Sequence, residues 1–244
     1  MIEDALTILW KEWREIVLPR GSLRRGALNL AFPVVVLGVF LPLIAGPGWV
    51  GIGSLILYVW MPPYLALGVV ADSFAGERER HTLETLLATR MSDTAILLGK
   101  VLTAVTYALA MTILVAFLGV AVINVAYARG AFIFFSFGTF AALVISSLLL
   151  TTTVANLGVL VSLRAPSVRI AAQRLSLWLV LPGLLATGVY TLLPAAAKDA
   201  ALAFLAAGGS VPVVAGIVFI VVALDEALFL VCVARFKRDK LVLG

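Results

Sequence analysis

Long apolar stretches, separated by short charged segments, run along nearly the whole chain. A helix needs about 20 consecutive apolar residues to cross the hydrocarbon core of a bilayer, and the sequence offers several stretches of about that length. We expect six spans, at about residues 27–44, 50–71, 95–125, 131–163, 176–193 and 211–233. The pattern predicts an all-α integral membrane protein with six transmembrane helices, in which residues 1–244 form a single transmembrane domain.

Two further segments have helical patterns but are unsuited to crossing. Within residues 1–25, apolar positions recur every three or four residues opposite a charged face, which predicts an amphipathic helix in the membrane interface. The apolar positions of this stripe are Ile2, Leu6, Leu9, Trp13 and Ile16. We expect Trp10 and Trp13 to lie at headgroup depth. Residues 194–210 are apolar but too short to cross, and they predict a re-entrant segment on the far side, between spans five and six.

Composition and charge agree with this class. Hydrophobic residues make up 63% of the chain and charged residues only 13%, whereas about a quarter of a soluble domain is charged. A net charge of +5 is compatible with nucleic-acid binding, but the placement of the positive residues along the chain argues for the membrane instead. Sixteen of the 18 Lys and Arg residues fall in the terminal segments and two loops that share one side. The positive-inside rule therefore predicts that both termini are cytoplasmic, in the cell membrane, with no nucleic-acid partner.

The loop between the second and third spans, residues 72–94, is rich in charged residues. Within it, Leu83, Leu86 and Leu87 share one face of a short helix, opposite Glu84 and Thr85. One alternative is that these leucines pack on the chain's own cytoplasmic surface or in the headgroup layer. The other is that they fit a groove on another protein.

The amino-acid sequence of this loop is similar to that of a known protein family. Gly76-Glu-Arg-Glu-Arg-His-Thr-Leu-Glu-Thr-Leu-Leu-Ala-Thr89, followed by Met91-Ser92 and Gly99-Lys100, resembles the signature loop of type-2 permeases of ATP-binding-cassette exporters. His81 stands where that family commonly has glycine, and Arg90 where it commonly has proline. The resemblance implies a permease subunit, working with a second permease copy and a separate ATPase that carries ATP and Mg. It implies no cofactor on this chain.

In that family the loop carries a coupling helix that docks on the ATPase. The residues expected by this resemblance to meet the ATPase or to orient the loop for it are Glu77, Glu79, Thr82, Leu83, Glu84, Leu86 and Leu87. A second basic loop, residues 164–175, is either another ATPase contact or a solvated connector. We expect a short basic helix within it.

Two groups of residues are candidates for a translocation path. Tyr58, Met61 and Tyr64 surround Pro62-Pro63, where the second span is expected to kink or unwind, although simple packing would also explain them. Asp225 and Glu226 are acids at bilayer depth, which marks them as functional candidates or as a buried structural pair.

No catalytic device stands out in the sequence. Gly99-Lys100 is followed by Val101, so the phosphate-binding loop of ATPases is missing, and we expect no enzyme activity of the chain itself. Single copies of cysteine and histidine rule out an internal disulfide and a His-based metal cage. The alternatives to an exporter permease are an ion-coupled secondary transporter that uses Asp225 and Glu226, and a non-transporting membrane assembly factor.

Overall fold

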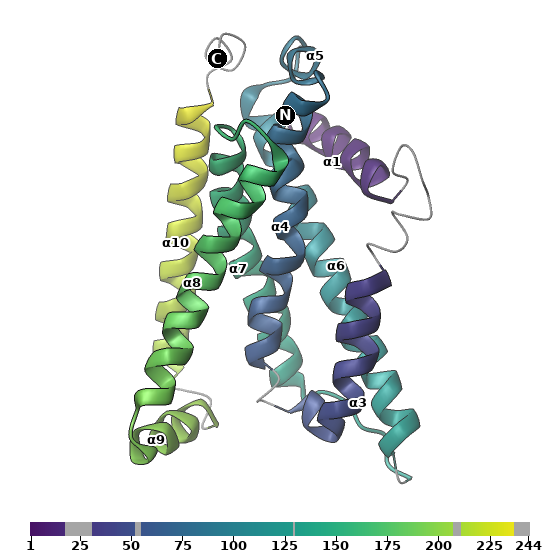
Figure 1. Ribbon diagram of the computed structural model, residues 1–244, viewed down its shortest axis with the longest axis vertical. Helices are drawn as coiled ribbons and strands as arrows, with labels where there is room; N and C mark the ends of the chain where they lie inside the picture. The colour runs from purple at the N-terminus through teal and green to yellow at the C-terminus, as the bar shows by residue number, and fades with distance from the viewer. Residues whose placement is uncertain (18–30, 52–54, 129, 207–210, 237–244) are drawn as a thin grey trace.

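The computed structural model describes residues 1–17, 31–51, 55–128, 130–206 and 211–236. Over these residues the chain is helical and contains no strand. Figure 1 shows an elongated bundle in which α4, α6 and α7 lie in the middle. α8 and α10 lie on one side and the first span on the other.

The N-terminal part combines a separate helix with an irregular span. α1 is Ile2–Val17. The first span, Ala31–Val50, passes from α-helix into the π-helical η1 (Val36–Phe40), α3 (Leu41–Ala45) and the 3-10 helix η2 (Gly46–Val50). The start of the span expected at 27–44 lies outside the described residues, and the helix ends later than expected.

The central helices follow the apolar pattern closely. α4 is Leu55–Glu79, α5 is Leu83–Leu87 and α6 is Asp93–Tyr127. α4 continues through Pro62 and Pro63 as one helix, so the expected unwinding does not occur. α6 begins at Asp93, close to the start expected at about residue 95, because Ser92 Oγ accepts a hydrogen bond from the backbone N–H of Ala95 at 3.3 Å.

The C-terminal half contains α7 (Phe137–Ser162), α8 (Val168–Leu192), α9 (Ala195–Ala206) and α10 (Val211–Arg235). One expectation was wrong: residues 164–175 are not a loop with a separate basic helix. α8 already starts at Val168, because Ser167 Oγ accepts from the N–H of Ile170 at 3.3 Å and nothing breaks the helix beyond it.

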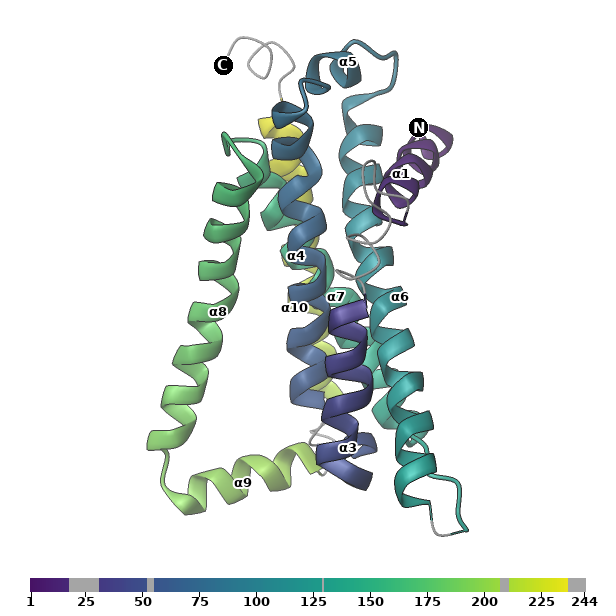
Figure 2. The same ribbon diagram turned by 45° about the vertical axis from the view of Figure 1, so that its right-hand side comes forward.

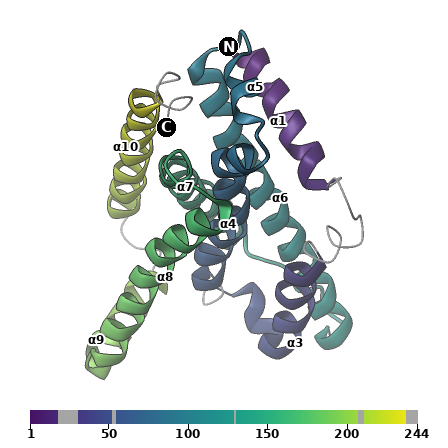
Figure 3. The same ribbon diagram turned by 45° about the horizontal axis from the view of Figure 1, so that its top comes forward.

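The connections alternate between two ends of the bundle. The start of α1, α5 and the last turn of α10 lie at one end, and η2, the turn after α6 and α9 lie at the other (Figures 1, 2 and 3). We call the first the α5 end and the second the α9 end. Among the described residues, four helices are long and apolar enough to cross a membrane: Ala31–Val50, Asp93–Tyr127, Phe137–Ser162 and Val214–Arg235. The chain is therefore a multi-pass membrane protein.

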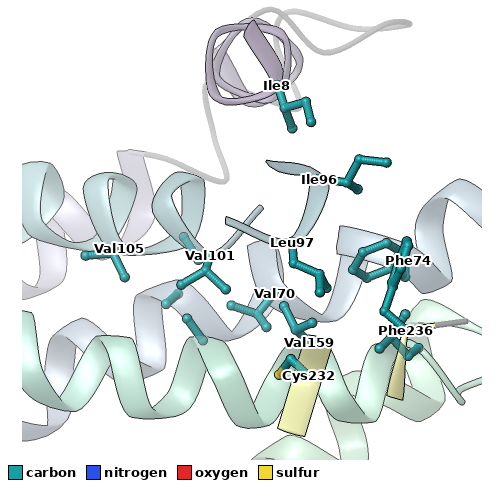
Figure 4. Close-up of a cluster of buried hydrophobic side chains, with 14 of the residues drawn as sticks. Ile8, Val70, Phe74, Ile96, Leu97, Val101, Val105, Val159, Cys232 and Phe236 are labelled. Carbon is teal, nitrogen blue, oxygen red and sulfur yellow. The ribbon is translucent and has the colours of Figure 1, made fainter. Parts of the chain in front are cut away.

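Small and hydroxyl residues allow close packing of α4 on α7. A Cβ at Gly158 would lie 2.1 Å from Val70 Cγ1, so only glycine fits there. One turn further on, the hydroxyl of Ser162 donates to the carbonyl of Ala71 at 3.0 Å and accepts from the N–H groups of Phe74 and Ala75. Figure 4 shows the buried cluster around this contact, which joins side chains of α1, α4, α6, α7 and α10.

Candidate functional site

A buried network of charged residues holds the last turn of α4 against α1 and α6. Lys100 Nζ lies 2.9 Å from Glu12 Oε1 and 3.7 Å from Glu77 Oε1. Glu77 Oε1 also accepts a hydrogen bond from Lys11 Nζ at 2.7 Å, and its other oxygen accepts from the hydroxyl of Thr82. Lys100 and Glu77 are 3% and 5% exposed. Ionic groups this well covered require partners, and here each has at least two.

The surroundings of Glu77 keep it ionised. Burial alone would raise its pKa, but the charge of Lys100 and the hydrogen bonds from Lys11 and Thr82 outweigh burial and lower the pKa to about 2. Lys100 is further fixed by donation to the carbonyl of Ser73 at 2.5 Å. Glu77 is therefore ionised at every physiological pH.

Arg78 and Glu79 attach the α7–α8 connection to the same last turn of α4. We call this turn, with the charged residues around it, the charged tip. The guanidinium of Arg78 donates to the carbonyl of Leu163 at 2.9 Å and to that of Ala165, which satisfies carbonyls at the end of α7. Glu79 Oε1 accepts from the N–H of Val168 at 3.0 Å, at the positive start of α8. Glu79 thus has a partner within its own chain, and orienting the loop is one of the two roles expected of it.

His81 ends α4 in an unusual backbone conformation. Its φ is +56°, in the left-handed region. The N–H of Thr82 donates to the carbonyl of Glu77 at 2.9 Å, and the N–H of His81 to that of Arg78 at 3.1 Å. This is the Schellman arrangement, whose left-handed position is usually glycine. The departure noted in the sequence therefore falls where the backbone favours glycine.

α5 divides its leucines between the core and the surface. Leu83 and Leu87 are each 5% exposed and belong to the cluster that contains Phe74 and Leu97. These two leucines therefore pack against their own chain, as the first of the two alternatives stated. Leu86 is half-buried, and Glu84 and Thr85 are exposed. The surface that α5 offers to another molecule consists of Glu84, Thr85 and one edge of Leu86.

A groove of about 400 Å³ lies between α1 and α5. Its walls combine apolar, hydroxyl and charged side chains from both helices and from the tip of α4. The lining residues include Thr7, Ile8, Lys11, Thr82, Thr85, Leu86, Thr89 and Met91. The groove is thus continuous with the exposed side of α5.

α1 docks on α6, a contact that the sequence pattern did not predict. Ile2 and Leu6 of the predicted stripe are exposed, with Trp10, while Ala5 and Ile8 are buried. Their fit depends on Gly99 of α6, where a Cβ would lie 2.8 Å from Ile8 Cβ and 2.9 Å from the carbonyl oxygen of Ala5. α1 therefore presents an apolar row outward, away from α6.

Trp13 also departs from the expectation of headgroup depth. Its indole N–H donates to the hydroxyl of Thr106 at 2.9 Å, and its ring lies edge-on to Tyr107. Trp13 thus fixes α1 on α6, and of the two tryptophans only Trp10 is exposed.

The structure separates the candidate path residues. Tyr58 and Met61 are 0% and 4% exposed and pack in a core cluster with Trp49 and Phe135. Tyr64 is 65% exposed. In this conformation, packing accounts for Tyr58 and Met61, and Tyr64 alone of the three reaches the surface.

The two acids of α10 also face different surroundings. Asp225 is 7% exposed and lies against α7, where the amide of Asn156 donates to the backbone carbonyl of Asp225 at 3.2 Å. Glu226 is exposed. They do not form a buried pair, because successive residues of a helix point about 100° apart.

Several residues of the charged site were missed by sequence reasoning. Lys11, Glu12 and Lys100 were counted only as charges, although Lys100 is at the centre of the network. A signal was present, since a lysine facing the core of an otherwise apolar helix requires carboxylate partners. Which carboxylates would meet it depends on the placement of α1, which no local pattern gives.

The fold and the site thus define a multi-pass membrane protein whose charged tip joins five helices. A family model described as "ABC-2 family transporter protein" matches residues 39–241, and the chain belongs to this family. Membership supports a permease role in an ABC transporter and a non-catalytic membrane subunit. A search of curated proteins finds no match.

Proposed function

We propose that this protein is the permease subunit of an ATP-binding-cassette exporter, driven by a separate ATPase that docks at the α5 end. The observation that carries the proposal is the attachment of α5 to the bundle. Thr82, at the start of α5, bonds to Glu77, and Glu77 is bound in turn to Lys11 and Lys100. A force on α5 therefore reaches α1, α4 and α6 through short polar contacts.

The docking surface that we propose is the exposed side of α5 together with the groove between α1 and α5. Glu84 and Thr85 project from the short helix, and the groove beside them has apolar and hydroxyl walls suited to a protruding side chain. Leu83 and Leu87 support the surface from below. Within the expected partner-binding set, Glu84 and Leu86 are then the direct contacts.

The same tip would pass the motion to the helices that flank a path. Arg78 and Glu79 hold the end of α7 and the start of α8, so closure of the ATPases would tilt α7 and α8 with α4. Six spans with both termini cytoplasmic follow if α4 and α8, each of 25 residues, also cross. In that topology α9 is the re-entrant segment on the outer side.

A second permease copy would complete the transporter. Most of α8 beyond its first turns is exposed and apolar, as in Leu177, Trp178, Leu181, Leu184 and Leu185. Such a surface suits lipid or a second copy, and an exporter of this design has two permeases and two ATPases, with ATP and Mg held by the latter. The substrate would leave between the two copies.

The direct test is co-purification of the ATPase with variants of α5. Leu86→Asp places a charge at the interface and should cost several kcal/mol, a hundredfold or more in affinity. Leu192→Asp is the matched control, since Leu192 is 86% exposed at the α9 end of α8, and it should leave ATPase binding unchanged. Normal binding and full coupled ATP turnover with Leu86→Asp would refute the docking surface. Transport that follows an ion gradient without any ATPase would favour the secondary transporter instead.

A further inference from the structure

Asp225 occupies a buried position that suits a neutral acid better than a carboxylate. It lies ten residues before Arg235 on α10, roughly 15 Å along the helix, and is 7% exposed. Its Oδ1 has no hydrogen-bond partner, and no salt bridge to Asp225 is found within the described part of the chain. An ionised carboxylate left in this state is strongly disfavoured.

The side-chain oxygens around Asp225 offer lone pairs. The amide of Asn156 donates to the backbone carbonyl of Asp225 at 3.2 Å, and its Oδ1 has no donor. Thr153 is also within hydrogen-bonding reach of the Asp225 carboxyl. However, the single hydroxyl hydrogen of Thr153 is directed to the carbonyl of Leu149 at 3.1 Å, so Thr153 has only acceptor capacity left for Asp225.

No neighbouring charge changes this balance. α7 carries no ionisable residue at all between Phe137 and Ser162. α6, which also contacts α10, carries Asp93 and Tyr127 at its two ends and Lys100 and Tyr107 between them. Lys100 is bound by Glu12 and Glu77, and the ring of Tyr107 lies against Trp13.

The remaining titratable groups lie on α10 itself, where Arg235 is roughly 15 Å along the helix from Asp225. Glu226 is exposed and carries the same sign as Asp225, and Cys232 is a buried thiol whose Sγ lies 3.4 Å from the carbonyl oxygen of Asn156. Neither supplies a positive charge, so each neighbour leaves the neutral form of Asp225 favoured.

We propose that Asp225 and Asn156 form a proton-binding site between α7 and α10, in which Asp225 is a neutral carboxylic acid. Its hydroxyl supplies the one hydrogen that the surrounding oxygens lack and links α10 to α7. If α7 and α10 separate and water enters, the acid ionises and releases the proton. Any conformational change that opens this contact is therefore linked to proton release.

Infrared spectroscopy of the full chain in lipid nanodiscs tests the site without the ATPase. At neutral pH the carbonyl stretch of a neutral carboxylic acid should be present in the wild type and in Glu226→Gln, and lost in Asp225→Asn. The same band should move to higher frequency in Asn156→Leu, which removes a hydrogen-bond acceptor, and this second variant serves if Asp225→Asn does not fold. Absence of the band from the wild type, or its persistence in Asp225→Asn, would overturn the proposal.

A bound metal cation is the competing occupant. In that case sodium, compared with choline, would raise the melting temperature of the wild type but not of Asp225→Asn, and the carboxylic acid band would be absent. We expect instead that the melting temperature is the same in both salts.

Discussion

Lys100 of α6 and Glu12 of α1 meet at 2.9 Å, with the lysine side chain 1% and the glutamate side chain 15% exposed. The contact joins α1 to α6. The same lysine also forms an ion pair with Glu77 of α4 at 3.7 Å. Three helices that are far apart in the sequence thus depend on one ammonium group.

Replacing Lys100 by Met should destabilise the protein strongly. The substitution keeps much of the side-chain volume but leaves Glu12 and Glu77 without their shared cation, and breaking a buried pair costs about 3–5 kcal/mol. The melting temperature in detergent measures the effect. Lys198→Met, on α9, is the control and should change little, since its ammonium hydrogen bond to the Thr191 carbonyl is exposed. Equal melting temperatures would show that the network contributes nothing to stability.

Acid should weaken the same network through Glu77. Its pKa is lowered from 4.5 to about 2 in the folded protein, so its stabilising contribution is complete above about pH 4.5 and is lost as the pH falls toward 2. Glu77→Gln removes this contribution at all pH values. The difference in melting temperature between the wild type and Glu77→Gln should therefore shrink below pH 4.5. A difference that stays constant to pH 3 would contradict the assignment.

His81→Gly should stabilise the end of α4. A non-glycine residue in the left-handed region costs about 1–2 kcal/mol, and part of that gain is offset by the greater freedom of glycine when unfolded, which leaves about 0.5–1 kcal/mol. His81→Val should have the opposite effect, because β-branched residues resist a positive φ. Thermal unfolding of both variants gives the comparison, and a lower melting temperature for His81→Gly would contradict the backbone assignment.

A single methyl group at Gly99 should displace α1 from α6. In Gly99→Ala the new Cβ would lie within 2.9 Å of Ile8 and of the Ala5 carbonyl oxygen, too close to fit without movement. We expect faster proteolysis within α1 and a lower melting temperature, because the free energy of unfolding should fall by about 1–3 kcal/mol. Gly68→Ala on α4 is matched, since nothing lies within 4 Å of its new Cβ, and there the higher helix propensity of alanine should be neutral or stabilising.

The topology can be checked by labelling single cysteines in a variant that lacks Cys232. Cysteines at Gly48 and Lys198 should react with an impermeant reagent added from outside, and a cysteine at Arg90 should not. Reaction at Arg90 from outside would reverse the proposed orientation.

Sequence patterns predicted the helices well where the information was local. α6, α7 and α10 begin and end within a few residues of the expected bounds, apart from the later start of α7, because apolar length is a local signal. A short helix with Leu83, Leu86 and Leu87 on one face was also predicted, and α5 is that helix. The sequence left open what covers these leucines, because the burial of Leu83 and Leu87 depends on Phe74 and Leu97. Apolar residues mark a buried face without saying which chain buries it.

The polar contacts were the least predictable part. Periodicity gave α1 an apolar stripe for the membrane interface but did not predict the contact of α1 with α6, which depends on the small residue at Gly99. Asp225 and Glu226 were treated together because they are adjacent, whereas the helical rotation between them sends one inward and one outward.

The attachment of Arg78 and Glu79 to the α7–α8 connection has a mechanical consequence. Because of this attachment, a rotation of the charged tip turns α8 with it. α8 then acts as a rigid arm of roughly 37 Å, at 1.5 Å per residue over its 25 residues. A tilt of about 10° at the tip would move the far end of such an arm by about 6 Å. A small movement of the charged tip at the α5 end would then be amplified most at the α9 end, where α8 and α9 meet.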